Sequence, residues 1–172
     1  MESFWNSVRG FSVRQGDYLP QCRVPVFQAD FGEGERTHNV DVLEYDLIVV
    51  TQSCDLEHNR VRLVALCPIH PIAEFEKVNP AFAQKGRWNE VLKGRIEGLH
   101  LLSSPTDPEN NREALVVDFR EIYSLPFDYL TERTLELGDR WRLKSPYLEH
   151  FSQAFARFFM RVGLPSTIPP FK

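Results

Sequence analysis

The sequence of 172 residues lacks several features that would assign it to a common class of protein. No apolar run approaches the roughly 20 residues that a helix needs to cross a bilayer. The first residues lack the basic and then apolar pattern of a secretion signal. Cysteine is scarce, with three residues in all, and an odd number suits a disulfide framework poorly. We therefore expect a cytoplasmic protein with reduced thiols and no membrane association.

An excess of basic residues is also missing. The net charge is −4 and the pI is about 5.7, whereas nucleic-acid-binding domains usually carry a positive excess. This weakens the case for general nucleic-acid binding but leaves a local basic groove open. The hydrophobic fraction of 42% and the 13 phenylalanines predict one globular domain with a substantial core.

The stretch 46–69 organises the predicted fold. Its two short apolar runs, at 47–50 and 61–66, are rich in β-branched residues and bounded by polar segments. Such runs are typical of buried strands. Between them lies the polar segment 52–58, which we interpret as a tight loop and as the first place to look for a functional site.

The remaining elements are predicted from turn signals and from hydrophobic spacing. We expect strands near 18–27, 40–45, 99–102, 114–125 and 141–143, and short helical pieces at 72–92, where Pro80 and Gly86 interrupt the chain. The spacing of Phe151, Phe155 and Phe158 predicts a helix over 145–163 with this stripe buried. The predicted organisation is a leader at 1–15, one domain at 16–165 with an insertion at about 72–98, and a tail at 166–172.

Several segments, taken in order, resemble a known family. They are Gly16-Asp17 and the runs 47–51, 64–69 and 116–120, followed by a C-terminal helix. This order resembles the PemK/MazF family, over roughly residues 16–163. The resemblance implies a mainly β fold with α elements, an SH3-like barrel carrying a helical insertion and a C-terminal amphipathic helix. The Gln-Ser-Cys-Asp element and the start of the last helix also resemble a group of bacterial proteins of unknown activity.

The residues that carry catalysis in the family are replaced in this sequence. The family's toxins cleave RNA without a metal, using an Arg before the second core strand and a Thr or Ser after the third. Here Glu44-Tyr45-Asp46 and His70 stand at those places, and an acidic segment does not stabilise transition-state negative charge as Arg does.

The resemblance therefore implies a divergent, non-toxin member of the family. We expect a binding or accessory module of a bacterial system, related to toxin–antitoxin pairs or to phage defence. It would act through the 52–58 loop and the barrel mouth on a protein partner or as a homodimer, and RNA remains a possible partner.

Two catalytic alternatives are open. A cysteine-dependent hydrolase would use Cys54 with Asp55 and a histidine base, which could be His58, His70 or His100. An RNA endonuclease with a displaced site would use His70 with Arg87 or Arg120. The structural alternative, which we favour, is that Cys54 packs as a small buried residue under the loop and Asp55 caps the turn.

The candidate binding residues gather in three places. They are Gln52, Asp55 and His58 in the 52–58 segment, Arg120 after the late strand, and Tyr147 with His150 at the start of the last helix. Zinc binding by Cys22, Cys54, Cys67 and His70 is disfavoured, because these residues lack the close Cys-x-x-Cys pairing of structural zinc sites. We expect neither a metal nor a cofactor.

Overall fold

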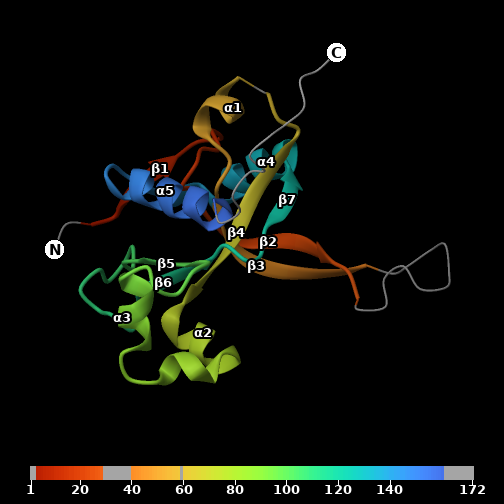
Figure 1. The fold of residues 1–172 in the computed structure, drawn as a ribbon. Coiled ribbons are helices and arrows are strands. Elements are labelled where there is room, and N and C mark those ends of the chain that lie inside the picture. The colour runs from red at the N-terminus through yellow and green to blue at the C-terminus, as the bar shows by residue number, and fades with distance from the viewer. Residues whose placement is uncertain (1–2, 29–39, 59, 161–172) are drawn as a thin grey trace, which may run out of the picture.

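The structure is a computed structural model that describes residues 3–28, 40–58 and 60–160 (Figure 1). Its strands are β1 (Trp5–Arg9), β2 (Tyr18–Val26), β3 (Asp41–Val49), β4 (Leu63–Pro71), β5 (Leu99–Leu102), β6 (Leu115–Asp118), β7 (Tyr123–Pro126) and β8 (Asp139–Leu143). Its helices are α1 (Ser53–Glu57), α2 (Ile72–Val78), the 3-10 helix η1 (Pro80–Ala83), α3 (Arg87–Leu92), α4 (Phe127–Leu137) and α5 (Tyr147–Phe159). The fold is mixed, with antiparallel β pairing throughout the described strands.

Strand β4 is the centre of the fold. It pairs with β3 along one edge, and along the other edge its first half pairs with β7 and its second half with β6. Both faces of the β3–β4 pair are covered: Ile48 and Cys67 join a core with α5, whereas Leu47 and Leu66 join a second core with α4. All four side chains are fully buried, so the continuous apolar runs correctly predicted the central strand pair.

The described strands do not close into a barrel. One sheet has the order β2-β3-β4-β6-β5, with β7 attached to β4, and β1 and β8 form a separate two-stranded sheet. Strands β2 and β5 are therefore edges of the larger sheet. The segment predicted as a leader contains β1, whose Trp5 is 3% exposed and donates its indole N–H to the carbonyl oxygen of Ser103 at 2.8 Å.

The short helical pieces predicted at 72–92 are confirmed. Helices α2, η1 and α3 follow β4 and enclose a third core in which Phe75 packs against Phe82 and Trp88, with ring centroids 5.2 and 5.8 Å apart. The long strand predicted at 114–125 is instead two strands. The chain leaves β6 at Phe119 and crosses to pair as β7 with the other half of β4, which is why the strand is broken.

Helix α5 confirms the predicted phenylalanine stripe. It begins at Tyr147, two residues later than predicted, and residues 161–163 of the predicted helix lie outside the described residues. Phe151 is fully buried, and Phe155 and Phe158 are half-buried against the same core. Helix α4, at Phe127–Leu137, was not predicted.

Candidate functional site

The segment predicted as a polar loop is a short exposed helix, α1, fixed to the end of the β3–β4 pair. The backbone N–H groups of Val50 and Thr51 donate to the carbonyl oxygen of Ala65, and the Thr51 hydroxyl accepts the N–H of Ala65 at 2.7 Å. Ser53 Oγ accepts the backbone N–H of Gln15 at 3.1 Å. The chain thus leaves β3 in a defined direction, and α1 carries the predicted site residues Cys54 and Asp55, with Gln52 and His58 as its caps.

Cys54 lies on the surface of α1, contrary to our expectation that it packs beneath the loop. Among the described residues, its thiol forms a side-chain hydrogen bond only with Gln52, 3.7 Å from Sγ to Oε1. Asp55 forms a long ion pair of 3.8 Å with Arg60, and His58 is exposed at the C-terminal end of the helix. A cysteine nucleophile needs a base within hydrogen-bond reach, and no described histidine occupies that position.

His70 lies at the other end of β4, beside α2 (Figure 1). It is five residues beyond Ala65, which at about 3.3 Å per residue is about 16 Å along the strand. His70 is half-buried, with its ring 6.0 Å from that of Phe75. Burial lowers the pKa of His70, and the nearby carboxylates of Glu121, Asp118 and Asp46 oppose that shift. The structure therefore does not bring Cys54 and His70 into one catalytic set.

Arg120 lies close to Asp118, one of the carboxylates near His70, but its guanidinium is paired with that carboxylate. Its Nε donates to Oδ1 of Asp118 at 2.7 Å, and its terminal nitrogen pairs with the second carboxylate oxygen. Arg87, the other candidate, lies on α3 with its guanidinium carbon 5.4 Å from the ring centroid of Phe82. Both arginines therefore have structural partners.

The two residues predicted at the start of the last helix have different surroundings. Tyr147 stacks on Phe4 with ring centroids 3.7 Å apart, so it holds the N-terminal segment against α5. His150 lines a pocket together with His100. Neither residue lies on α1.

Metal binding has no support in the part of the chain that the structure describes, where no three His, Cys, Asp or Glu residues are placed to hold an ion. Cys22 and Cys67 are buried in different cores, and burial raises the pKa of each thiol to about 12. Together with exposed Cys54, they do not form a common site.

A pocket of about 710 Å³ lies beside α1. We call it the α1 pocket, and it is predominantly apolar. Its lining residues come from the 10–17 segment, α1, the segment before β4, the end of β7 and α4: Phe11, Ser12, Val13, Leu56, Glu57, Val61, Arg62, Pro126, Phe127, Asp128 and Thr131. Its volume lies within the range of small-molecule or side-chain binding pockets.

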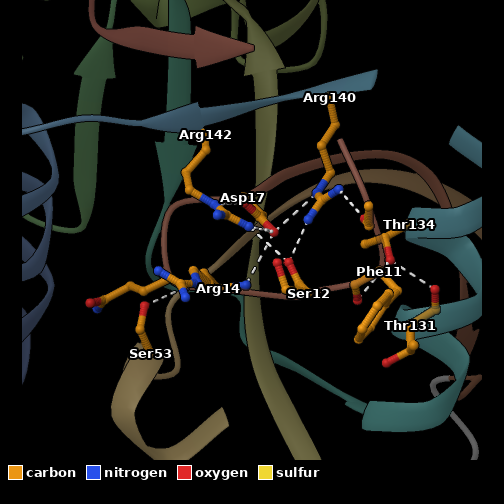
Figure 2. Close-up of polar contacts among 11 residues, drawn as sticks. Phe11, Ser12, Arg14, Asp17, Ser53, Thr131, Thr134, Arg140 and Arg142 are labelled. Carbon is orange, nitrogen blue, oxygen red and sulfur yellow. Dashed lines mark hydrogen bonds and ion pairs between the residues drawn. The ribbon is translucent and has the colours of Figure 1, made fainter. Parts of the chain in front are cut away.

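One wall of the α1 pocket is held by a buried ionic network. Figure 2 shows the guanidinium groups of Arg140 and Arg142 converging on Asp17, which is fully buried. Oδ2 of Asp17 accepts from Arg140 Nε at 3.1 Å and from Arg142 at 2.9 Å. Arg140 also donates to the backbone carbonyl oxygen of Gly10 at 2.7 Å, and Arg142 donates to that of Ser12 at 2.8 Å. This satisfies the buried charges and fixes the backbone of the wall.

The same wall is tied to α4. The single hydroxyl proton of Thr134 is shared between the carbonyl oxygens of Thr131, at 2.8 Å, and Phe11, at 3.2 Å. The Phe11 side chain remains 66% exposed. An exposed aromatic side chain on a backbone fixed in this way is a preorganised contact surface. Sequence reasoning missed Asp17, Arg140 and Arg142. The available signal was the pair of arginines two residues apart in β8, which places both on one face of the strand.

No protein-family model matches the sequence, and no curated protein matches it either. Among the helices that the structure describes, none has the length and apolar character required to cross a membrane.

Proposed function

We propose that this protein is a non-catalytic binding module that captures an apolar side chain of a protein partner in the α1 pocket. The observation that carries the proposal is the position of this pocket. It lies against the exposed helix α1, and its wall is held rigid by the Asp17 network. A rigid apolar pocket beside a polar helix fits the interface pattern of an apolar anchor surrounded by a polar rim.

The rim of the pocket supports a protein partner over a highly charged one. It carries both signs of charge, with Glu57 and Asp128 opposed by Arg62. Glu57 is itself paired with Arg14 at 2.7 Å. A mixed rim gives little net attraction for the phosphate backbone of a nucleic acid, which requires a basic surface. Filling of the apolar interior is then the main source of affinity.

We further propose that the chain is a divergent, open relative of the PemK/MazF-like SH3 barrel and acts as an accessory protein in a bacterial toxin–antitoxin or defence system. Support comes from the antiparallel β2-β3-β4 core and the C-terminal helix. The acidic replacements at the family's catalytic position support a non-toxin role. A homodimer that buries the same pocket is the alternative partner.

The proposal is tested by selecting peptides from a displayed library and measuring their dissociation constants with an environment-sensitive dye attached to Cys54. Phe11→Ser removes an exposed aromatic from the pocket wall, and Phe159→Ser removes a similarly exposed one from α5. We expect F11S to weaken binding by about thirtyfold or more, the scale of an interface hot spot, and F159S to leave it unchanged. Equal binding by wild type and F11S would refute the α1 pocket as the binding site. Light scattering on the same proteins tests the homodimer.

A further inference from the structure

A second pocket, of about 430 Å³, lies between the loop that follows α3, the start of β5, and α5. We call it the histidine pocket. Residues far apart in sequence meet there, among them His100, Phe119, His150, Gln153, Arg157 and Phe158. None of them lines the α1 pocket, so the inference is independent of the proposed function.

The floor of the histidine pocket is built from aromatic rings. The half-buried ring of His100 stacks on Phe119 with centroids 6.0 Å apart and meets Phe151 edge-on at 5.8 Å. Burial, and secondarily His150, lowers the pKa of His100 to about 4. The imidazole is therefore neutral at pH 7, with one donor and one acceptor nitrogen. None of the described residues forms a hydrogen bond with the side chain of His100.

Gly98 allows this floor to close tightly. It has a φ of +83°, and a Cβ at this position would lie 2.8 Å from Cγ of Arg120 and 3.2 Å from a ring carbon of Phe158. Its carbonyl oxygen accepts the backbone N–H of Phe119 at 2.7 Å. The flat apolar surface under the pocket is thus fixed by backbone contact as well as by side-chain packing.

The rim is polar and lies largely on one face of α5. His150, Gln153 and Arg157 follow each other at spacings of three and four, which places them on a single helical stripe. Within the described residues, the side chains of these three make no hydrogen bond or ion pair. The opposite rim carries Lys93, which pairs with a carboxylate of α3 at 3.7 Å, and the carboxylate Glu97.

We infer that the histidine pocket binds a small molecule that combines a flat aromatic ring with one anionic group, either a phosphate ester or a carboxylate. The ring would lie against Phe119, Phe158 and His100. The anion would accept hydrogen bonds from the guanidinium of Arg157, the imidazole of His150 and the amide of Gln153. Charge-assisted bonds from arginine are the strongest of these. The volume suits a ligand of this size.

The inference is tested on the full chain with phenyl phosphate and benzoate as probes and benzyl alcohol as the neutral analogue, by following the ring C–H NMR signals of His100 and His150. We expect both signals to shift with at least one anion, and Arg157→Gln to weaken that binding by about tenfold or more, as for loss of a hydrogen bond to a charged group. The matched control Arg23→Gln removes an exposed arginine from β2 and should leave binding unchanged.

Each result decides between supporting and rejecting the inference. Tighter binding of phenyl phosphate identifies a phosphate ester, and tighter binding of benzoate identifies a carboxylate; both support the shared chemistry. Unshifted histidine signals at millimolar concentrations of both anions would overturn the inference, as would equal affinity for benzyl alcohol or an unaffected R157Q variant. Because F11S changes only the α1 pocket, it should bind the anions like the wild type whether or not the proposed function is correct.

Discussion

Replacing Asp17 by Asn tests the buried network that holds the wall of the α1 pocket. The substitution keeps the shape of the side chain but removes its negative charge and one acceptor oxygen. Asp17 accepts from Arg140, from Arg142 and from the backbone N–H of Arg14 at 3.1 Å. The side chains of Asp17 and Arg140 are 0% and 1% exposed. The variant therefore leaves a guanidinium buried without a counter-charge.

The expected loss of unfolding free energy follows from this burial. Removing one partner of a buried ion pair costs about 3–5 kcal/mol. Arg142 is 17% exposed and can recover part of its hydration, so we expect a value near the lower end of that range. Since small domains are stable by about 5–15 kcal/mol, D17N should lose a large share of its stability.

The measurement is a urea titration with linear extrapolation, and the control is Asp139→Asn. Asp139 pairs with Arg9 on the same two-stranded β1–β8 sheet, but the two side chains are 58% and 75% exposed. Solvent screens such a pair, so D139N should leave the unfolding midpoint unchanged. If D17N were as stable as D139N, the argument that the wall is held by a buried charge network would be wrong.

Three further predictions concern titration, thiol exposure and activity. The pKa of His100 is about 4 in the folded protein and about 6.5 in the unfolded chain. As the pH falls, the unfolded chain therefore binds a proton at this histidine before the folded protein does. Stability should fall by about 3 kcal/mol from pH 6.5 to pH 4, and His100→Gln should flatten this slope in urea titrations. A maleimide should label Cys54 alone in the native protein, since Cys22 and Cys67 are buried, with mass spectrometry finding all three labelled in urea. Mixed single-stranded RNA should remain intact on gels after incubation with the protein, and sequence-selective cleavage would instead support the endonuclease alternative.

The elements that the sequence predicted are those specified by local pattern. The apolar runs of β3 and β4 are buried on both faces, and the spacing of Phe151, Phe155 and Phe158 matches one stripe of α5. Helix α4 was missed although Phe127, Leu130, Thr134 and Leu137 recur at spacings of three and four and join or border one core. The helical spacing was present in the sequence, but threonine is not counted as apolar when such a pattern is read. Thr134 can be buried because its hydroxyl is hydrogen-bonded.

Long-range pairing explains what local pattern does not predict. The break between β6 and β7 depends on β4 changing partners along its length, which residues 114–125 do not encode by themselves. The separation of Cys54 from His70 follows from the direction of β4. Likewise, the meeting of Asp17 with Arg140 joins residues more than 120 positions apart. Candidate residues of suitable type were therefore identified, but their grouping into sites required the fold.

The acidic segment at 44–46 has a structural use that bears on the proposed loss of toxin activity. The carboxylate of Asp46 accepts the Tyr18 hydroxyl at 2.5 Å and the backbone N–H of Gln21 at 2.9 Å. Gln21 has a positive φ of +51° and lies in the irregular part of the β2–β3 register, between Leu19 and Cys22. A non-glycine residue in this conformation requires support from its surroundings, and Asp46 provides it. The acidic residue Asp46 is therefore built into the path of β2, and its replacement would remove the support of Gln21 together with the negative charge.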